Sequence, residues 1–375
     1  MKILVTGAKG FIGRNICLFL AQNGHTALEY DLGNTDLELE QFVREADAII
    51  HLAGINRPLN PEEFLDGNVN FTKKLLDTVK KAGRKLPLVF SSSTQASLDN
   101  PYGKSKKAAE DEVFAFAKEF DNPVFVYRFY NVFGKWCRPN YNSVIATFCY
   151  NVAHDIPLKI NEAAGPINFV YIDDICKEMI KVLSGDVSRA TEPLFVEPHY
   201  SVTLKELSEA LYFFKDSRTS LQTCLQDNGF YQKLYSTYLS YLEEDNFVYP
   251  LTPHKDLRGS FTEFLKTEQY GQVSVNVSKP GITKGNHYHN SKNEKYLVVK
   301  GVCEIKLRKV FTDDVISIIC DDKDLRVVDI PPGYTHSIKN IGKEDSVTIM
   351  WANELYDPKN PDTFFLPVEG ENNGK

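Results

Sequence analysis

The sequence predicts an α/β domain with a doubly wound parallel sheet, followed by an all-β barrel. The chain has 375 residues, which is about twice the usual size of a single domain. Its first half alternates short β-branched runs with stretches of helix length, and its last third consists of short strand-like runs broken by turn residues. The two rhythms are typical of βαβ units and of antiparallel barrels or sandwiches, respectively.

The strands of the first domain are expected at five apolar runs, each followed by a stretch with helical periodicity. A repeated βαβ rhythm predicts a parallel sheet. Ile3 to Val5 are continuously apolar, which is typical of strands covered by helices on both faces. The runs are KILVTGA (2–8), HTALEYD (25–31), ADAIIHLAG (46–54), LPLVFSSS (86–93) and PVFVYRFYNV (123–132).

The rhythm changes from about Phe247, where an acidic turn and two prolines follow an aromatic stretch that we expect to be helical. We therefore predict domains at residues 1–246 and 247–369, with a frayed tail after them. The expected barrel strands are GQVSVNVS (271–278), KYLVVKG (295–301), CEIKLRKV (303–310), DVISIIC (314–320), LRVVDIPPG (325–333) and DSVTIMWAN (345–353).

Composition excludes several classes of protein. The formal net charge is −7 and no basic run is present, which argues against nucleic-acid partners. Seven cysteines without a C-x-x-C pair argue against a disulfide framework or a thiolate zinc site and fit a reducing cytoplasm. The chain shows no leader and no apolar run near the roughly 20 residues of a membrane span. We expect a cytoplasmic protein without a membrane partner.

The glycine-rich loop TGAKGFIG directly follows the first strand and opens the first helix. Glycines there let the backbone approach a pyrophosphate at a helix N-terminus. Asp31, at the end of the second strand, could accept a hydrogen bond from an adenosine ribose and favour NADH, or be an ordinary solvated carboxylate. Lys9 and Arg14 could instead attract a 2′-phosphate and favour NADPH. The predicted loop contacts are Gly7, Lys9, Gly10, Phe11, Ile12 and Gly13.

Three residues supply the chemistry of ketone reduction. Ser93 ends a strand, and Tyr102 and Lys106 lie four apart on the helix that follows Asn100 and Pro101, a plausible N-cap and first helical position. A tyrosine can act as a general acid toward a carbonyl if an ammonium lowers its pKa and a hydroxyl orients the substrate oxygen. A Tyr and a Lys four residues apart are common on surface helices. The prediction therefore depends on where the two residues lie, at the start of a helix that follows the strand ending at Ser93.

The first 185 or so residues resemble the extended short-chain dehydrogenase/reductase superfamily, which implies a Rossmann-type sheet and nucleotide-sugar substrates. The resemblance implies that Ser93, Tyr102 and Lys106 are catalytic, that Ala53, Tyr102 and Lys106 contact the cofactor, and that Asn131 lies near the sugar nucleotide. Alternatively, Asn131 and Arg128 only satisfy backbone groups of their loop. The motifs are TGAKGFIG, HLAG (51–54), NVNFT (68–72), SSST (91–94), YGKSK (102–106), RFYNVFG (128–134) and FVYIDDI (169–175).

The second domain carries a pattern that resembles both cupin motifs. His287 and His289 alternate along a strand and point to one face, where Glu294 and His336 can meet them inside a barrel. Imidazoles with one carboxylate suit Zn, Fe, Mn or Ni, and we predict one divalent ion, Zn²⁺. The glycine that usually begins the second motif is replaced at Leu325.

The segment DLRGSFTEF (256–264) resembles the motif of dTDP-sugar 3,5-epimerases, a metal-independent cupin-like group. That resemblance implies that Arg258 and Glu263 contact nucleotide sugar and that His287 is a proton-abstracting base. Alternatively, Asp256, Arg258 and Glu263 form an ordinary salt bridge at a strand entry. Spacing leaves both roles of His287, ligand or base, open.

Nearly the whole chain resembles the bifunctional capsular-polysaccharide enzymes of the UDP-N-acetyl-L-fucosamine pathway. The resemblance implies that the cupin domain epimerises C3 of UDP-2-acetamido-2,6-dideoxy-β-L-arabino-4-hexulose and that the reductase domain then reduces C4, giving UDP-2-acetamido-2,6-dideoxy-L-talose. It also implies a homodimer, NADPH as the cofactor with NADH tolerated, and a substrate contact at Arg138. His287 and Tyr334 both stay candidates for the C3 base.

Two other functions fit the same sequence. The first is a nucleotide-sugar reductase whose cupin is a non-catalytic binding or dimerisation module. The second is a non-enzymatic NAD(P)-sensing regulator with the reductase fold, a class that usually lacks an intact Tyr and Lys. Because Tyr102 and Lys106 are both present, the enzyme is the stronger prediction.

Overall fold

The computed structural model describes most of the chain, and its described residues form two compact units. The first unit contains Met1–Phe133, Cys137–Ser143 and Pro166–Val202, and the second contains Gly134–Trp136, Val144–Gly165 and Thr203–Lys375. The described residues are 1–58, 60, 62–161, 165–189, 191–222, 229–252, 254–256, 259–261, 271–354 and 359–369.

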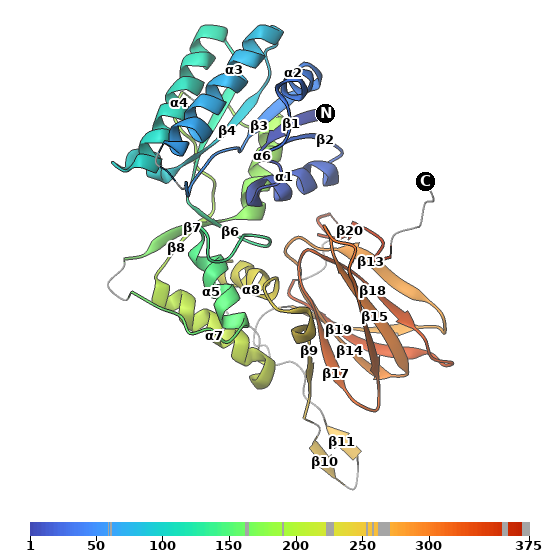
Figure 1. The fold of residues 1–375 in the computed structure, drawn as a ribbon. Coiled ribbons are helices and arrows are strands. Elements are labelled where there is room, and N and C mark those ends of the chain that lie inside the picture. Colours follow the sequence, from blue (N-terminus) through green and yellow to red (C-terminus); the bar gives the residue numbers. More distant parts are fainter. Residues whose placement is uncertain are drawn as a thin grey trace. The chain divides into compact units, whose positions relative to one another are not determined.

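The first unit is built on a five-stranded parallel sheet with the order β2–β1–β3–β4–β5. The chain leaves β1 in one direction to reach β2 and returns to the other side of β1 for β3, so the strand order reverses there (Figure 1). Ligands of open parallel sheets bind at the carboxyl edge of such a switch point. The strands are β1 (Lys2–Thr6), β2 (Thr26–Tyr30), β3 (Ala48–His51), β4 (Leu88–Ser93) and β5 (Val124–Phe129).

Helices cover both faces of this sheet, as the continuously apolar strands predict. Leu4 and Ile49 face a core with the second, third and fourth helices, whereas the alternate residue Ile3 is equally buried on the other face. The first and sixth helices pack against each other. The helices are α1 (Phe11–Gln22), α2 (Asp36–Glu45), the π-helical η1 (Leu65–Asn70), α3 (Phe71–Ala82), the 3₁₀ turn η2 (Thr94–Ser97), α4 (Pro101–Phe120) and α6 (Ile172–Leu183).

A second, three-stranded sheet with the order β6–β7–β8 completes the first unit. β6 (Asn131–Phe133) pairs in parallel with β7 (Ile167–Tyr171), and β7 pairs antiparallel with β8 (His199–Val202). β6 follows β5 after a single residue, Tyr130. The motif RFYNVFG therefore carries the chain from the parallel sheet into this smaller sheet.

Three helices that precede the predicted domain boundary belong to the second unit: α5 (Val144–Ala153), α7 (Leu204–Ser220) and α8 (Phe230–Leu239). α8 is the aromatic helix expected before the acidic turn, and η3 (Glu244–Phe247) is that turn. The compact units thus do not divide at residues 246 and 247. The predicted domain boundary stays a prediction, and the three helices before it belong to the same compact unit as the barrel.

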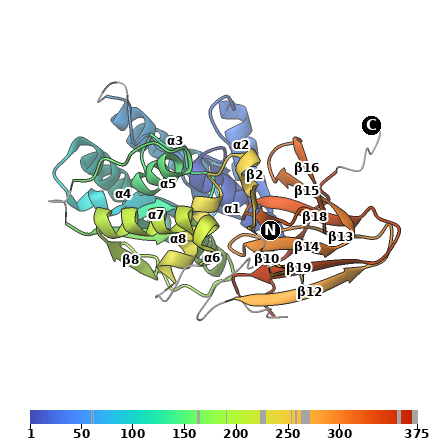
Figure 2. The same cartoon turned by 90° about the horizontal axis from the view of Figure 1, so that it is seen from below.

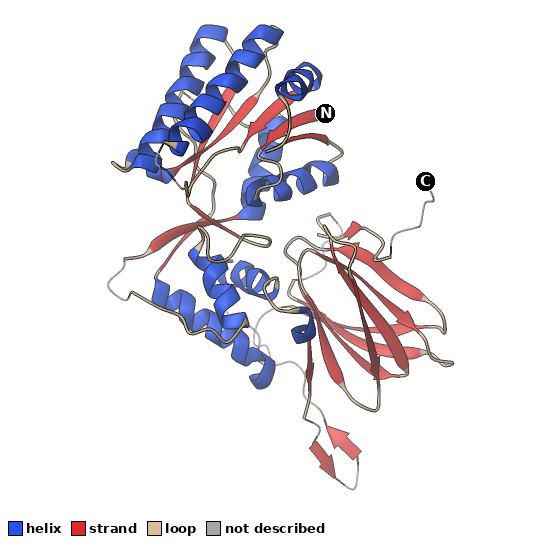
Figure 3. Cartoon of the chain, in the orientation of Figure 1, coloured by secondary structure: helices blue, strands red, loops and turns tan. Residues whose placement is uncertain are grey.

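The barrel is formed by two five-stranded sheets, with the orders β12–β19–β14–β17–β9 and β16–β15–β18–β13–β20 (Figures 2 and 3). The strands are β9 (Val248–Pro250), β12 (Gln272–Ser278), β13 (Thr283–Tyr288), β14 (Glu294–Lys300), β15 (Val302–Lys309), β16 (Val315–Asp321), β17 (Arg326–Ile330), β18 (Tyr334–Asn340), β19 (Ser346–Ala352) and β20 (Phe364–Phe365). A separate hairpin joins β10 (His254–Asp256) and β11 (Gly259–Phe261).

The predicted fold class, a Rossmann-type parallel sheet followed by a cupin-like antiparallel barrel, is confirmed. All six predicted barrel runs form strands, whereas β13 and β18 were expected only through their histidine motifs. Among the described residues, no helix combines the length and the apolar character that crossing a bilayer requires.

Candidate active sites

The glycine loop brings β1, β3 and α1 into close contact at the switch point. Gly7 has a φ of +70°, and a Cβ there would lie 2.8 Å from the backbone nitrogen of Ala53. A Cβ at Gly13 would lie 2.1 Å from the Gly7 carbonyl oxygen. Glycine is therefore required at both positions, at the first for conformation and close approach and at the second for helix packing.

The N-terminus of α1 favours a bound anion. Gly10 is the N-cap and makes no side-chain cap, and the first turn contains no acidic residue. Unpaired N–H groups and the helix dipole favour negative charge at such an end. The loop thus has the structure that a pyrophosphate site needs.

Asp31 is tied to the glycine loop rather than turned to solvent. Its Oδ2 accepts a hydrogen bond from the Lys9 backbone N–H at 2.7 Å, and its Oδ1 accepts one from the Leu32 N–H at 2.7 Å. The carboxylate is half-buried beside the loop, while the Lys9 side chain is exposed. Both residues that bear on cofactor choice therefore lie at the same loop.

Ser93 and Tyr102 are brought together as the sequence predicts. Ser93 is the last residue of β4, and Tyr102 lies in the first turn of α4, which begins at Pro101 and is capped by Asn100 through a 2.8 Å bond from the Gly103 N–H. Burial raises the pKa of Tyr102, and a hydrogen bond with Ser93 opposes the rise. Burial thus outweighs the hydrogen bond from Ser93, and the expected effect of Lys106 on the pKa of Tyr102 stays a prediction.

Lys106 is a buried cation directed at the end of β4. Its Nζ donates to the Ser91 carbonyl oxygen at 2.7 Å and lies 5.0 Å from the centre of the Phe90 ring. Burial lowers its pKa to about 8, and the charge of Glu110 opposes that fall. The ammonium form therefore still predominates at neutral pH.

Glu110 and Arg128 form a buried pair that the sequence did not reveal. The Arg128 Nε and Nη2 atoms donate to the two oxygens of Glu110 at 2.8 and 2.7 Å, and the Ser92 hydroxyl donates to the same carboxylate at 2.5 Å. Arg128 therefore binds a carboxylate rather than backbone groups. The available signal was an acidic residue one turn after Lys106, followed on the same helix face by the apolar Val113.

Asn68, from the NVNFT motif, connects the loop after β3 to the catalytic helix. Its amide accepts from the Ile55 N–H at 2.8 Å and donates to the Ser105 hydroxyl at 2.9 Å.

His51, from the HLAG motif, is fully buried between Thr6 and Thr72, and burial lowers its pKa to about 3. The His51 imidazole is therefore neutral at pH 7 and has a structural role.

Two of the four predicted substrate-binding residues lie in the described part of the chain. Asn131 is exposed at the start of β6 and donates to the Asn168 carbonyl at 3.1 Å. Arg138 is exposed, with its guanidinium 5.4 Å from the centre of the Tyr141 ring. Arg258 and Glu263 lie outside the described residues.

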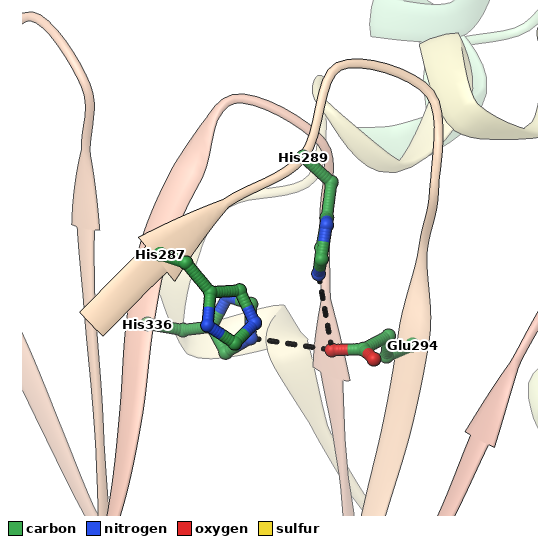
Figure 4. A group of neighbouring side chains, drawn as sticks. All are labelled: His287, His289, Glu294 and His336. Carbon is green, nitrogen blue, oxygen red and sulfur yellow. Dashed lines mark hydrogen bonds and ion pairs between the residues drawn. The ribbon is translucent and has the colours of Figure 1, made fainter. Parts of the chain in front are cut away.

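The four predicted metal ligands converge in the barrel (Figure 4). One potential ligand atom from each of His287, His289, Glu294 and His336 lies within 4.8 Å of the others. Glu294 Oε2 is 3.4 Å from His289 Nε2 and 3.2 Å from His336 Nε2. The sequence thus predicts correctly which side chains meet.

Strand pairing explains why His287 and His336 are neighbours. They occupy facing positions of β13 and β18, next to a bulge at Asn286, which has a φ of +60°. A Cβ at Gly285 would lie 2.8 Å from the His336 carbonyl, so glycine permits this close approach. Bulges commonly redirect side chains beside functional sites.

The donor set fits a divalent cation. His336 is fully buried: its Nε2 lies 3.2 Å from Glu294 Oε2, and its Nδ1 has no hydrogen-bond partner among the described residues. Buried polar atoms without partners are costly unless a ligand satisfies them. Burial, with His336 and His289, lowers the pKa of His287 to about 4, so its imidazole is neutral at pH 7.

Glu294 remains ionised in the barrel. Burial alone would raise its pKa, but hydrogen bonds and charge from His289 and His336 hold the pKa well below its usual range. The Tyr296 hydroxyl also donates to Oε2 at 3.0 Å. Three imidazoles with one carboxylate suit Zn²⁺ and related divalent ions.

Tyr334, the other candidate base, is buried at the start of β18. Its ring contacts Phe247 at 5.0 Å between centroids, and its hydroxyl has no hydrogen-bond partner in the described part of the chain. Burial, then Glu244 and Glu243, raise its pKa far above the usual value. The phenol is therefore protonated at neutral pH.

Two known families match this chain in sequence. The NAD dependent epimerase/dehydratase family matches residues 3–192. The polysaccharide biosynthesis C-terminal domain matches residues 254–364. The first match spans the glycine loop and the Ser93, Tyr102 and Lys106 site, and the second spans all four candidate ligands.

Similar proteins cover the whole chain. A UDP-2-acetamido-2,6-beta-L-arabino-hexul-4-ose reductase from Pseudomonas aeruginosa is 46% identical over 98% of this chain and 99% of its own. The crystal structure of the capsular polysaccharide assembling protein CapF from Staphylococcus aureus is 47% identical, covers 98% of this chain and 100% of its own, and has a TM-score of 0.68. A UDP-glucuronic acid 4-epimerase from Bacillus cereus, in complex with NAD, shares the fold at 21% identity over 57% of this chain and 83% of its own, with a TM-score of 0.52.

Proposed function

The chain belongs to the NAD dependent epimerase/dehydratase family, and from this premise we propose that it is a UDP-sugar 4-ketoreductase of capsular polysaccharide biosynthesis. Its substrate is UDP-2-acetamido-2,6-dideoxy-β-L-arabino-4-hexulose, in keeping with the similar reductase and with CapF. The observation that carries the proposal is the Ser93, Tyr102 and Lys106 arrangement beside a glycine loop that fits a dinucleotide.

The reductase residues each have one task in this reaction. A bound nicotinamide supplies the hydride for C4 of the sugar. Ser93 orients the C4 oxygen, and Tyr102 donates its phenol proton to that oxygen as the alkoxide forms. Lys106 holds the nicotinamide ribose and provides the positive charge next to the tyrosine. A raised pKa keeps Tyr102 protonated, which is the state required of an acid in the reducing direction.

The pH dependence of ketone reduction should reveal the protonation of the Lys106 ammonium. Because its pKa is about 8, the ammonium is present below pH 8 and lost above it. We expect kcat/KM for the ketosugar to fall about tenfold per pH unit on the alkaline side, measured as NADPH oxidation at low ketosugar concentration. Lys106→Arg, which keeps its charge throughout, should be slower but lose this alkaline limb. A wild-type rate that stays constant to pH 10 would contradict the assignment.

The cupin domain is proposed to epimerise C3 before reduction. A C4 ketone acidifies the C3 proton, so epimerisation has to precede the step that removes the ketone. His287, His289, Glu294 and His336 would hold one divalent ion, Zn²⁺, whose charge stabilises an enolate. Where His287 does not serve as the fourth ligand, its imidazole, neutral at pH 7, would accept the C3 proton. The other candidate, Tyr334, would first have to give up its own phenol proton. The product is UDP-2-acetamido-2,6-dideoxy-L-talose.

The decisive experiment follows both positions of the sugar at once. The 4-ketosugar is incubated with the protein in deuterated water, with and without NADPH, and C3 and C4 are observed by NMR. We expect C3 deuteration without cofactor and C4 reduction only with it. Reduction without C3 exchange would support the second candidate, a reductase with a non-catalytic cupin. If neither C3 exchange nor C4 reduction is observed, the remaining hypothesis is the non-enzymatic NAD(P)-sensing regulator.

Cofactor choice is proposed to favour NADPH through Lys9. The exposed Lys9 ammonium can reach a 2′-phosphate, whereas Asp31 is engaged with the loop backbone.

We further propose that the protein is a cytoplasmic homodimer, in keeping with the free cysteines and with the enzymes that the sequence resembles.

Lys9→Ala should raise the KM for NADPH about 10-fold, as expected for the loss of one charge-assisted hydrogen bond, and leave that for NADH nearly unchanged. Steady-state kinetics with both cofactors measures the difference, and Lys118→Ala, at another exposed lysine of the same unit, is the control. Equal effects on both cofactors, or a wild-type preference for NADH, would assign specificity to Asp31 instead.

A further inference from the structure

Residues 361–368, here called the C-terminal brace, run along the strands that carry the metal-binding histidines. Within the brace, β20 pairs with β13 directly at His287 and Tyr288. The Leu366 carbonyl accepts a hydrogen bond from the hydroxyl of Thr335, the neighbour of His336. The brace therefore supports the strands of two of the three histidines from outside the ligand cluster.

The third histidine is held differently, because His289 follows the last residue of β13. No ladder pairing is recorded for it among the described residues. The His289 ring is nevertheless buried, and its Nδ1 donates to the backbone carbonyl of Asp362 at 2.6 Å. That bond requires a proton on Nδ1 and directs Nε2 toward the ligand cluster, where it lies 3.4 Å from Glu294 Oε2.

The side chain of Asp362 holds the loop that follows His289. Its carboxylate accepts four hydrogen bonds from three consecutive residues, and its own backbone has a φ of +39°. Non-glycine residues in this region are uncommon and persist where surrounding contacts enforce them. The donors are the backbone N–H groups of Asn290 (3.0 Å), Ser291 (2.9 Å) and Lys292 (2.8 Å) and the hydroxyl of Ser291 (3.1 Å).

We propose that Asp362 is a positioning residue of the metal centre: its carboxylate fixes the loop after His289 while its carbonyl orients the imidazole toward the ion. Nothing but a carboxylate suits this place, because three N–H groups converge on it and an amide would present its own donors to them. Outer partners of this kind commonly change metal affinity by about 10- to 100-fold. The inference rests on the proposed metal centre.

The test compares Zn²⁺ binding in wild type, Asp362→Asn and Glu369→Gln. The last is a matched control, since Glu369 lies just beyond the brace and pairs with Lys306 at 2.5 Å, outside the ligand cluster. Competition with a chromophoric chelator should show a Kd for Zn²⁺ raised about 10- to 100-fold in Asp362→Asn and unchanged in Glu369→Gln. The visible absorption of bound Co²⁺ should change in Asp362→Asn only.

The outcomes separate this inference from the metal centre itself. Wild-type protein that fails to bind Zn²⁺ would overturn both. Equal affinity in wild type and Asp362→Asn would overturn the role of Asp362 and leave the centre intact. Thermal unfolding of the metal-free proteins checks that each is folded. If Asp362→Asn does not fold, Ser291→Ala takes its place, with an expected loss of about 2- to 10-fold for one hydrogen bond, and unchanged binding then overturns the inference.

Discussion

Tyr102→Phe should abolish reduction of the C4 ketone while leaving C3 deuterium exchange intact. The substitution removes only the phenolic oxygen that hydrogen-bonds with Ser93. Loss of a general acid costs about 10²- to 10⁴-fold in rate, so kcat for NADPH oxidation should fall by at least that factor. The KM for NADPH should change little, because Lys106 and the glycine loop remain.

The same NMR experiment in deuterated water measures the exchange that should survive. Tyr212→Phe is the control, because Tyr212 is an exposed tyrosine of α7. A folded Tyr102→Phe protein that has lost C3 exchange would show that one site serves both steps. Full reductase activity in that variant would remove Tyr102 from the mechanism.

His336→Ala should empty the metal centre. His336 is fully buried and contributes one of four potential ligands that lie within 4.8 Å of one another. Because even outer partners of metal ligands change affinity by about 10- to 100-fold, loss of a ligand should exceed about 100-fold. Elemental analysis should find close to one ion per wild-type chain and far less in the variant.

C3 exchange should disappear with the metal, whereas reduction of a ketosugar that already has the product configuration at C3 should continue. His25→Ala, at a histidine near the N-terminus in the first unit, serves as the matched control. Equal metal content in wild type and His336→Ala would refute the site. Loss of metal with C3 exchange preserved would instead make the ion structural.

Much of the reductase site is local in sequence, which is why it could be predicted. The glycine loop spans eight residues, and Tyr102 and Lys106 share one helix face through their four-residue spacing. Asn100 and Pro101 mark the start of α4 through cap chemistry that acts within one turn, and the structure confirms both. The convergence of the four side chains in the barrel was also predicted, from the spacing of the two cupin-like motifs.

The state of those residues depends on burial, which spacing does not reveal. Lys106 was expected to lower the pKa of Tyr102, yet the desolvation of Tyr102 raises it. The partner of Arg128 on β5 is the buried Glu110 on α4. The sequence did not reveal this pair, because packing brings the two elements together. A pKa is set by solvent access and by the charges that packing brings near.

Residue types, their local spacing and the resemblance to known families predicted the two fold classes, the glycine loop, the candidate reductase residues and the four side chains that converge in the barrel. Only the tertiary structure decided that α5, α7 and α8 belong to the same compact unit as the barrel, and that Asp362, 73 residues away in sequence, holds His289. Short-range periodicity and cap chemistry act through neighbours along the chain. Contacts between distant segments exist only once the barrel has closed and buried them, so no local pattern encodes them.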